Sequence, residues 1–445
     1  MIVLKIGGTS MGDAARMDRA LDLAVARSED APVMVCSAMG GVTDRIIESY
    51  TLAEKGDVAG SAAIFEAIKD RHYACAREFL EGDLLQAVVL DLDGMFAQFA
   101  SLLKGVGLLR DCSPRSRDAL LSFGERLSTR LIQARGRQKG LDTVLLDARE
   151  FIRTDSTFNS ARPDMKETTA LTRAGVIPEP GRILITQGFI GSNRAGVTTT
   201  LGRGGSDYSA SIIGAALDAV EIQIWTDVNG IMTCDPRIIP EASTIPEITY
   251  DEAGELAYFG AKVVHPATIQ PAVAKGIPVI VKDTGAPEKD GTRITAGGGG
   301  PGIKAISAKK NITLVSITSS RMLEAHGFLR SIFAIFDAAE TPVDLVTTSE
   351  VSVSMTIEKT DALPSILEEL EELGEVTVEG NQAIICMVGQ GLWKDAKFSS
   401  RAFGALEDIP VRMISLGASE VNLSIVVPCD SVGDTLKSLH TRLFG

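Results

Sequence analysis

The chain begins Met1-Ile2-Val3-Leu4-Lys5-Ile6-Gly7-Gly8-Thr9-Ser10, and this stretch decides how the rest of the sequence is interpreted. Its apolar residues 2–4 predict a short buried strand. A lysine, two glycines and two hydroxyl residues follow, so backbone N–H groups and an ammonium group can approach one anion where the strand ends. An ordinary strand-to-helix turn can have the same composition, so the stretch favours a phosphate site without establishing one.

Similar apolar runs recur and alternate with helical patterns. They lie at residues 33–35, 144–146, 183–185, 222–225 and 279–281. Strands that alternate with helices predict a mainly parallel sheet covered on both faces. Met17, Leu21 and Val25 fall at i, i+4 and i+8, which predicts a helix packed on this sheet. Residues 45–140 have helical patterns almost throughout, so we expect a helical excursion within the α/β domain.

Length, composition and charge limit the class of protein. The 445 residues are too many for one typical core, so we expect two or three domains. No apolar run approaches the roughly 18 residues of a membrane span, and the N-terminus lacks the features of a targeting peptide. The formal charge of −14 argues against nucleic acid or an anionic membrane as partner, because both need a positive surface. We expect a cytoplasmic protein.

The cysteines and histidines do not suggest a metal centre. The six cysteines and four histidines are scattered along the chain, without a C-x-x-C pair. Neither zinc-binding spacing nor a disulfide framework is visible. We therefore expect no metal held by the protein alone.

The glycine-rich residues 296–302 mark the clearest domain boundary, because such a segment cannot pack a core. An internal repeat follows: Ser-Glu-Val-Ser-Val-Ser at 349–354 is echoed by Ser-Glu-Val-Asn-Leu-Ser at 419–424. Each copy reads strand, helix, strand, strand, helix, which predicts two small α+β units. The expected limits are 1–295 for the α/β domain, 296–303 for the linker, and 304–380 and 381–445 for the repeats, with a strand near 304–310 as a candidate to complete the second.

A second anion-binding candidate is Thr200-Leu201-Gly202-Arg203-Gly204-Gly205-Ser206-Asp207, before a predicted helix at 208–217. Glycines and a capping serine or aspartate at a helix start expose N–H donors, and Arg203 adds a fork suited to a carboxylate or phosphate. A flexible loop before a capped helix explains the glycines. It does not explain the arginine among them.

Further candidates are individually weaker. Thr226 and Asp227 follow the predicted strand at 222–225, and ligands of open α/β sheets lie outside the carboxyl ends of strands. Lys262 could reach a nucleotide and Glu125 an ammonium group. Each of these residues equally fits an ordinary turn or a solvated surface.

Taken together, the motifs resemble the aspartate kinases of the amino-acid-kinase family over essentially the whole chain. Besides the two anion-binding stretches, the matching segments are 37–44, 124–128, 225–237 and 259–266. The repeat resembles the paired ACT modules of that family. The resemblance implies an amino-acid-kinase fold, in which helices sandwich a mostly parallel sheet, followed by two ferredoxin-like α+β modules. It also implies transfer of the γ-phosphoryl group of ATP to the side chain of L-aspartate, the first step of lysine, threonine and methionine biosynthesis.

The resemblance implies a role for each matching residue. Lys5 would neutralise the transferring phosphoryl group, and Asp207 would organise Lys5 or the Mg²⁺ carried by ATP. Arg203 would hold the α-carboxylate of aspartate and Glu125 its ammonium group. The rest of that pocket would be Ser37, Thr43, Gly204 and Ser206. The nucleotide would be surrounded by Lys5, Gly7, Gly8, Thr9, Thr226, Asp227, Met232, Arg237 and Lys262.

The first module resembles a lysine-sensing ACT module, which implies feedback inhibition by lysine. Its effector residues would be Met322, Gly327, Phe328, Leu329, Val343, Asp344 and Ser349. Asp344 would face the lysine ammonium, and the turn at 327–329 would offer backbone donors at a helix start. The alternative is a silent module in which these are only core and turn residues. The resemblance also implies a homo-oligomer, a homodimer or tetramer joined through the ACT modules.

Three other interpretations are less favoured. A kinase of the same family could act on glutamate, acetylglutamate, carbamate or UMP, but the run at 198–209, Gly124-Glu125 and the two C-terminal modules disfavour it. A silent sensor could keep the fold and only bind effectors, but the intact Lys5, Glu125, Arg203 and Asp207 argue against it. A fusion to homoserine dehydrogenase is not expected, because the sequence ends at Gly445 soon after the second repeat. Ile6 and Met232 depart from the family pattern, which has phenylalanine at the first position and often an aromatic residue at the second. Both replacements are apolar and put adenine fit or packing in doubt more than catalysis.

Overall fold

The computed structural model describes residues 1–260, 264–323 and 326–445. The chain divides into two compact units. The first unit consists of Met1–Ile231, Pro246–Tyr250 and Val263–Gly298; the second consists of Met232–Ile245, Asp251–Lys262 and Gly299–Gly445. The last crossing between them, after Gly298, falls inside the predicted glycine-rich boundary.

An eight-stranded sheet forms the centre of the first unit, with the order β3-β5-β2-β1-β8-β10-β11-β9. The strands are β1 (Val3–Ile6), β2 (Val33–Cys36), β3 (Asp142–Leu146), β5 (Arg182–Gln187), β8 (Ile222–Thr226), β9 (Glu247–Thr249), β10 (Val279–Asp283) and β11 (Thr292–Thr295). Neighbouring strands pair in parallel, except β10 with β11. The six strands predicted from apolar runs are all present in this sheet.

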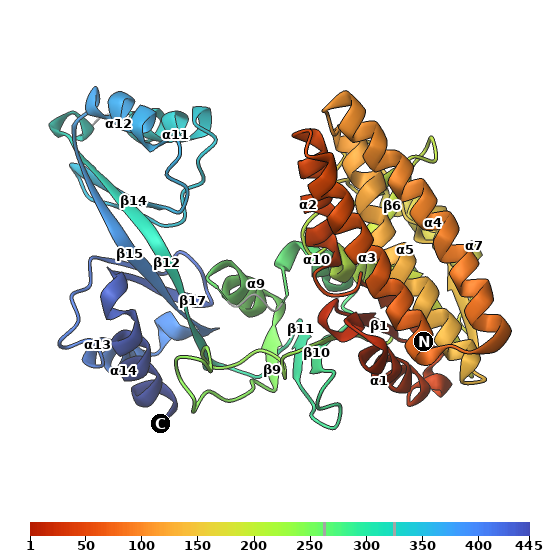
Figure 1. The fold of residues 1–445 in the computed structure, drawn as a ribbon. Helices are drawn as coiled ribbons and strands as arrows, with labels where there is room; N and C mark the ends of the chain where they lie inside the picture. Colours follow the sequence, from red (N-terminus) through yellow and green to blue (C-terminus); the bar gives the residue numbers. More distant parts are fainter. Residues whose placement is uncertain (261–263, 324–325) are drawn as a thin grey trace. The chain divides into compact units, whose positions relative to one another are not determined.

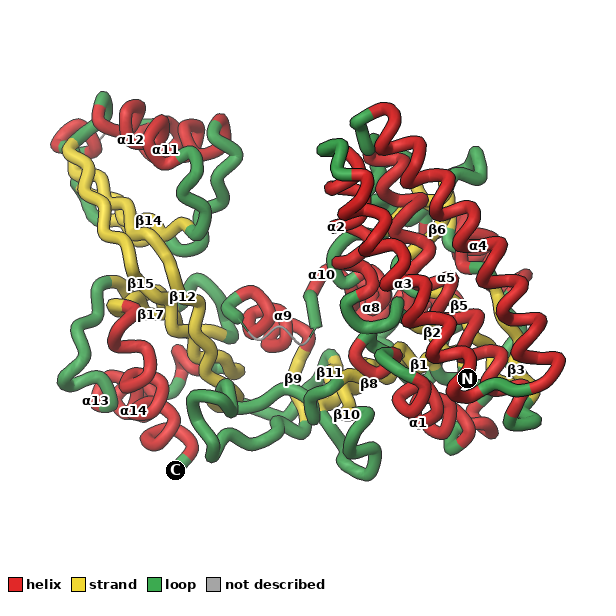
Figure 2. The backbone as a smooth tube through the Cα atoms, in the orientation of Figure 1, coloured by secondary structure: helices red, strands yellow, loops and turns green. Residues whose placement is uncertain are grey.

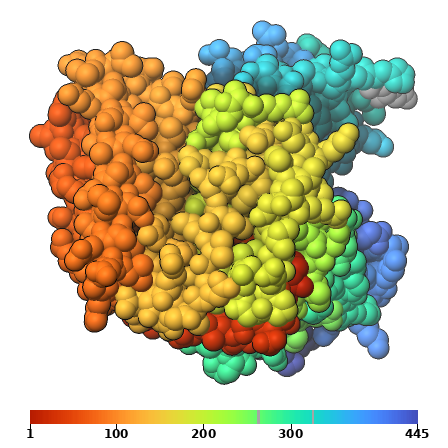
Figure 3. All heavy atoms as spheres, turned by 90° about the vertical axis from the view of Figure 1, so that its right-hand side faces the viewer, coloured from red at the N-terminus to blue at the C-terminus, as the bar shows by residue number. Residues whose placement is uncertain are grey.

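Helices cover both faces of this sheet (Figures 1 and 2). On one face lie α1 (Ala14–Val25) and α5 (Pro114–Gln138), with α2 (Val42–Glu54), α3 (Val58–Phe79) and α4 (Gly82–Leu109) packed beyond them. On the other lie α7 (Met165–Gly175), α8 (Gly205–Ala216) and α10 (Pro266–Ala274). Helices α2 to α5 are the predicted excursion, and they form one side of the first unit's surface in Figure 3.

One detail of the predicted helix over α1 is wrong. Met17 and Leu21 are buried, but Val25 is 38% exposed. At 100° per residue, position i+8 has turned about 80° away from position i, whereas position i+7 returns to the same face. Ala24 holds that position and is fully buried.

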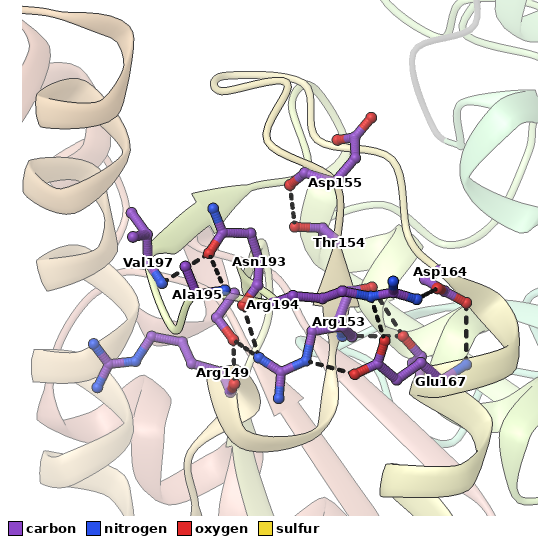
Figure 4. Close-up of polar contacts among 12 residues, drawn as sticks. Arg149, Arg153, Thr154, Asp155, Asp164, Glu167, Asn193, Arg194, Ala195 and Val197 are labelled. Carbon is purple, nitrogen blue, oxygen red and sulfur yellow. Dashed lines mark hydrogen bonds and ion pairs between the residues drawn. The ribbon is translucent and has the colours of Figure 1, made fainter.

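A small three-stranded sheet sits beside the main one in the first unit. It consists of β4 (Arg153–Thr154), β6 (Ile190–Asn193) and β7 (Thr198–Thr200), and the short helix α6 (Ala148–Phe151) precedes it. Arg194 pairs with both Asp164 and Glu167 at 3.0 Å, and Arg153 pairs with Glu167 at 3.5 Å (Figure 4). These contacts brace the sheet from which the predicted arginine loop emerges after Thr200.

The two repeats in the second unit share a single six-stranded sheet, with the order β13-β14-β12-β15-β17-β16. Its strands are β12 (Gly302–Thr318), β13 (Val346–Thr348), β14 (Ser352–Ile357), β15 (Glu375–Gln390), β16 (Met413–Leu416) and β17 (Asn422–Pro428). The long strands β12 and β15 pair from Gly302 opposite Gln390 to Thr318 opposite Glu375. Each therefore serves both repeats.

Each repeat keeps its own core on this shared sheet. Helices α11 (Phe328–Ala338) and α12 (Leu363–Glu371) pack in one core, and α13 (Ala396–Gly404) and α14 (Val432–Phe444) pack in the other. Ile306, near the start of β12, belongs to the core of the second repeat. Helix α9 (Tyr250–Tyr258) comes before the repeats in the sequence, and all of it after Tyr250 belongs to the second unit. The exact domain limits stay predictions.

Within the described residues, we find no helix with both the length and the apolar character that a membrane span requires.

Candidate active site

The candidate site lies in the first unit, where the adjacent strands β5, β2, β1 and β8 end. The segments that follow these strands are hydrogen-bonded to their neighbours in a row. Ser37 N donates to Ile6 O at 3.1 Å, and Gly7 N donates to Trp225 O at 3.0 Å. Gly188 N donates to Cys36 O at 2.9 Å. The motifs predicted at separate places in the sequence therefore share one edge of the sheet, where ligands of open α/β sheets bind.

At one end of the site, Lys5 and Asp207 form an ion pair. Lys5 Nζ lies 2.7 Å from Asp207 Oδ1, and the side chains are only 12% and 13% exposed. Lys5 belongs to β1, and Asp207 lies in the first turn of α8. A Cβ at Gly7 would lie 3.2 Å from Trp225 O and 3.5 Å from Lys5 Nζ, so a side chain there would crowd the ammonium group.

The glycine turn after β1 packs against the turn after β2. A Cβ at Gly8 would meet Ala38 O at 3.2 Å. Arg71, from α3, joins the two turns by donating to Gly40 O and to Gly12 O, each at 2.7 Å. The glycine turn after β1 is therefore braced by a side chain more than fifty residues away in the sequence.

At the other end of the site, Glu125 is a buried acid with no lysine or arginine paired to it among the described residues. It lies on α5 and is 3% exposed. Oε1 accepts a hydrogen bond from Ala38 N at 3.2 Å, while the buried Oε2 has no partner among the described residues. Burial raises the pKa of Glu125 to about 8, although the Ala38 hydrogen bond opposes the rise. A ligand ammonium at Oε2 would supply the missing charge.

Ser37 and Thr43 lie beside this carboxylate. Ser128, three residues after Glu125, donates from Oγ to Ser37 O at 2.8 Å. A Cβ at Gly124 would lie 3.9 Å from Thr43 Oγ1. Both predicted hydroxyl residues are half-buried and close to the helix that carries Glu125.

The arginine loop leads into α8. Arg203 is exposed and makes no hydrogen bond or ion pair with any described residue. Gly204 is the N-cap of α8 with φ of +71° and no side-chain cap. Gly205 N donates to Gly202 O at 3.0 Å, so the N–H groups of Ser206 and Asp207 are the ones at the helix start without a partner among the described residues. A Cβ at Gly204 would lie 2.8 Å from Thr268 Cγ2, so only glycine fits. Ser206 packs against Gly188, where β5 ends.

Comparison with known proteins fits this arrangement. The model of the amino acid kinase family matches residues 1–283, and an ACT domain model matches residues 385–443. Lysine-sensitive aspartokinase 3 of Escherichia coli strain K12 is 36% identical over 100% of this chain and 99% of its own length. The chain belongs to the aspartokinase family. Aspartokinase 1, chloroplastic, of Arabidopsis thaliana is 37% identical over 99% of this chain and 80% of its own length.

Solved aspartokinases share the fold of this aspartokinase. The crystal structure of E. coli aspartokinase III in complex with aspartate and ADP matches it with a TM-score of 0.85 at 36% identity and covers 100% of both chains. The structure of the same enzyme with lysine and aspartate matches with a TM-score of 0.83 over the same coverage. The predictions of family, of enzyme class and of an amino-acid-kinase fold followed by ACT modules are confirmed.

The nucleotide residues predicted for this aspartokinase are only partly assembled in one unit. Thr9 is exposed at the start of a short 3-10 helix after β1. Thr226 ends β8 and donates from Oγ1 to Asp227 Oδ1 at 3.2 Å, at the same sheet edge as Lys5. These residues belong to the first unit, and their nucleotide roles stay predictions.

The other nucleotide residues are not placed with this group. Met232 belongs to the second unit and forms a bridge with Thr244 there. Arg237, also in the second unit, is 87% exposed and pairs with Asp235 at 2.7 Å. Lys262 lies outside the described residues. The nucleotide roles of these residues stay predictions.

The predicted effector residues lie in the first repeat of the second unit. Met322, Phe328 and Val343 pack against the same core, and Gly327 is the N-cap of α11 with φ of +87°. Leu329 is 40% exposed, and Ser349 is exposed and bonded to Ser352.

Asp344 is the most buried polar group of this set. Its side chain is 4% exposed. Oδ1 accepts from Tyr258 Oη at 2.5 Å and lies 3.0 Å from Lys309 Nζ. The buried Oδ2 has no hydrogen-bond partner among the described residues. Asp344 therefore already has a cation of this chain on one oxygen, and the other is open to a ligand.

Two residues that shape the active site were missed in the sequence. Arg71 gives no local signal, because its partners are two distant backbone carbonyls. Asp118 is fully buried on α5 and accepts hydrogen bonds from Thr200, at the start of the arginine loop. It did have a signal: it lies seven residues before Glu125, and residues seven apart share one face of a helix.

Proposed function

We propose that this aspartokinase transfers the γ-phosphoryl group of ATP to the side-chain carboxylate of L-aspartate and so forms 4-phospho-L-aspartate. The observation that carries the proposal is that a cation held by an acid and a buried, unpaired acid lie at the same edge of the sheet. Lys5 with Asp207 offers a held cation, and Glu125 offers a buried oxygen without a partner. A solved relative in complex with aspartate and ADP supports it.

The chemistry needs charge cancellation more than proton transfer. The aspartate side chain has a pKa of about 4, so it is ionised at neutral pH and needs no general base. One of its oxygens attacks the γ-phosphorus, and the bond from that phosphorus to the β–γ bridging oxygen breaks, so ADP leaves with the electron pair. Lys5 stabilises the charge that builds up on the phosphoryl oxygens. Asp207 holds the Lys5 ammonium in position. Mg²⁺ carried with the nucleotide would neutralise further phosphate charge.

Aspartate would be recognised by the charges that do not react. Its ammonium group pairs with Glu125, which then becomes the ionised partner that burial disfavours in the free protein. Its α-carboxylate takes the two-pronged guanidinium of Arg203. With both α-substituents held, the side-chain carboxylate is left to face the phosphoryl group beside Lys5. Ser37, Thr43, Gly204 and Ser206 complete the pocket.

The nucleotide would lie along the ends of β1 and β8. Gly8 and Thr9 offer backbone N–H groups to the phosphates, and Gly7, whose own N–H donates to Trp225 O, lets them approach because it has no side chain. Thr226 with Asp227 faces the rest of the nucleotide. Met232, Arg237 and Lys262 are the further members of this proposed site.

A coupled kinase assay against aspartate, glutamate and N-acetylglutamate tests the proposed substrate. We expect aspartate to be phosphorylated with much the highest kcat/KM, and hydroxylamine to trap the acyl phosphate as a hydroxamate. Preference for either other amino acid would instead make this chain a different carboxylate kinase. If no substrate consumed ATP while lysine still bound, the chain would be a sensor.

Feedback by lysine is the second part of the proposal, and a comparison of the two repeats supports it. Asp344 follows the Pro-Val pair of the first repeat, and Arg412 follows the equivalent pair of the second. Asp344 is buried, whereas the Arg412 side chain is 53% exposed and pairs with Glu379. The position after the Pro-Val pair is therefore acidic and buried in the first repeat, which suits a cationic amino acid, and basic and half-exposed in the second.

The starts of the two equivalent helices differ in the same sense. Helix α11 begins at Gly327, which provides no side-chain cap, so its first N–H groups are available to an amino-acid carboxylate. Helix α13 begins at Asp395, whose own carboxylate accepts a hydrogen bond from Lys397 N. Among the residues that the structure describes, the first repeat combines a helix start without a side-chain cap and a buried acid, and the second does not.

Isothermal titration of the intact protein with lysine tests this site. We expect lysine to bind and Asp344→Asn to abolish the heat. The matched control is Glu358→Gln, because Glu358 also pairs with Lys309, at 3.1 Å, but is 63% exposed. No lysine heat in the wild-type protein would remove this part of the proposal, and heat with threonine in its place would redirect it.

The remaining parts of the proposal concern the metal, the assembly, the location and the pathway. They are Mg²⁺ as the metal brought by ATP, assembly into a homodimer or tetramer through the ACT modules, a cytoplasmic location, and a place at the first step of lysine, threonine and methionine biosynthesis. The name of the lysine-sensitive relative supports the regulation.

A further inference from the structure

Asp118 is a buried carboxylate of the first unit that the proposed reaction does not use. It lies near the start of α5 and is fully buried. It forms no ion pair with any lysine or arginine among the described residues. Burying a charge without a counter-ion is costly unless hydrogen bonds hold it, so the groups that hold Asp118 show what it does.

All of the donors to Asp118 come from two loops. Thr200 donates twice, from Oγ1 to Oδ1 at 2.7 Å and from N to Oδ2 at 2.9 Å. Asn159 N donates to both carboxylate oxygens, at 3.0 and 3.1 Å. These donors partly offset the rise in the pKa of Asp118 that burial causes. One carboxylate thus joins helix α5 to two loops that do not belong to it.

The two loops also support each other around Gly202. Ala161 N donates to Thr200 O at 2.9 Å. A Cβ at Gly202, where φ is +78°, would lie 3.2 Å from Asn159 O. Arg203 is the next residue. The backbone that leads to Arg203 is therefore held at Thr200 by hydrogen bonds to Asp118 and is packed at Gly202 against the Asn159 backbone.

Helix α5 connects this support to the other end of the aspartate pocket. Asp118 and Glu125 lie seven residues apart, which places them on one face about 10.5 Å apart along the axis. The same helix face thus carries Glu125, the proposed partner of the aspartate ammonium group. Through Asp118 it also holds the loop that carries Arg203, the proposed partner of the α-carboxylate.

We propose that Asp118 is a positioning residue that holds Arg203 at the distance from Glu125 that the ammonium and α-carboxylate of one aspartate molecule require. The proposal rests on the proposed function, since it assumes that these two groups bind those two charges. A purely structural role for Asp118 would instead affect all substrates and turnover alike.

Steady-state kinetics of Asp118→Asn distinguish these roles. Asparagine has the same size as aspartate, but its amide replaces the two carboxylate oxygens. One oxygen becomes an NH₂ donor and the other a weaker acceptor, so the N–H groups of Thr200 and Asn159 lose hydrogen bonds. We expect the KM for aspartate to rise about 10-fold or more, as for the loss of hydrogen bonds to a charged group, and the KM for ATP to change less than about twofold. Equal rises in both KM values, or a fall in kcat alone, would overturn the proposal.

Asp155→Asn is the matched control. Asp155 lies in the same loop as Asn159 and, like Asp118, accepts hydrogen bonds from backbone N–H groups, those of Thr157 and Arg162. It contacts Thr154 in the small sheet (Figure 4) but makes no hydrogen bond or ion pair with Thr200 or the arginine loop among the described residues. We expect its KM for aspartate to stay at the wild-type value. A rise equal to that of Asp118→Asn would mean that any loosening of this loop has the same effect, against the proposal.

The double variant Asp118→Asn with Arg203→Ala tests whether Asp118 acts through Arg203. If it does, Asp118→Asn should change the KM for aspartate by less than about twofold once Arg203 is gone, because coupled residues are not additive. Additive effects would overturn the proposal. An unchanged KM in Arg203→Ala alone would instead contradict the proposed function itself, so the two failures are distinguishable.

Thr200→Val keeps the test decisive if Asp118→Asn does not fold. Valine keeps the shape of threonine in β7 and removes only the hydroxyl that donates to Asp118. We expect a rise of about threefold to tenfold in the KM for aspartate, with ATP unaffected. A wild-type KM for aspartate in a folded Thr200→Val protein would count against the role of Asp118.

Discussion

The two ends of the candidate site hold their charges in opposite ways. Where β1 ends, Lys5 and Asp207 are already paired and only 12% and 13% exposed. At the amino-acid end, Glu125 is buried with one oxygen unpartnered, and Arg203 is exposed without a partner among the described residues. The paired end suits a group whose charge changes only during the reaction. The charges at the unpaired end find partners only when a ligand brings two fixed charges. Mutations at the paired end should therefore lower kcat, and mutations at the unpaired end should raise the KM for aspartate.

Removing Lys5 should give the largest effect and should appear in turnover. We expect Lys5→Ala to lower kcat about 100-fold or more, the scale of losing one transition-state charge contact, with a much smaller change in the KM for aspartate. Steady-state kinetics measure both. Lys139→Ala is the control, because Lys139 is also ion-paired at 2.7 Å, to Asp22, outside the site. Wild-type turnover in Lys5→Ala would refute the role of Lys5.

Removing Arg203 should give the next largest effect and should appear in binding. We expect Arg203→Ala to raise the KM for aspartate about 10- to 100-fold, while kcat at saturating aspartate changes far less, because the α-carboxylate is bound equally before and during the reaction. Arg162, an exposed arginine in the neighbouring loop, provides the control variant Arg162→Ala. If kcat fell and the KM did not change, the proposed division between the two ends would be lost.

Glu125 should make aspartate binding depend on pH. Burial raises the pKa of Glu125 to about 8, so at neutral pH the free protein holds it mostly protonated. An ammonium ligand needs the ionised form. The KM for aspartate should therefore fall by up to about tenfold per pH unit between pH ~6.5 and ~8 and then level off. Glu125→Gln should raise the KM and flatten this profile. A flat profile in the wild-type protein would show that Glu125 does not titrate on binding.

The same division explains how much of the site could be predicted from the sequence. The local motifs were visible because a short strand followed by glycines, or glycines before a helix, need only neighbouring residues to form an anion site. Lys5 and Asp207 lie 202 residues apart, yet each belongs to one of the two predicted anion-binding stretches, and the two side chains form the expected pair. The fold followed from the alternation of strands and helices in the same way.

Residues that act through distant backbone groups could not be predicted. The partners of Arg71 are the carbonyls of Gly12 and Gly40, which any residue possesses. The shared sheet of the two repeats was anticipated only in part: a strand near 304–310 was a candidate to complete the second repeat, but β15 runs across the expected limit between 380 and 381. Asp118 had a helical spacing to Glu125, but only the fold shows that Thr200 lies beside it.

The smallest expected effect is on stability, and its sign should differ between the two ends. The folded pKa of Glu125 is raised from 4.5 to about 8. Because burial disfavours the ionised form, the raised pKa leaves the fold at full stability below the unfolded pKa. The free energy of unfolding then falls as pH rises from the unfolded pKa to the folded pKa, by up to about 1.4 kcal/mol per pH unit. Glu125→Gln does not ionise, so its Tm should exceed that of the wild type by a margin that grows from pH ~5 to ~8, to a few degrees.

Lys5→Met should do the reverse, because it leaves Asp207 with no cation at a mostly buried position. Calorimetry of the full chain measures both variants, and ATP identifies the transition of the first unit by shifting it. A lower Tm for Glu125→Gln at pH ~8 would mean that Glu125 is held by partners in the free protein after all. The unpaired end would then be no more dependent on its ligand than the paired end, and the difference in kinetics expected between them would have no physical basis.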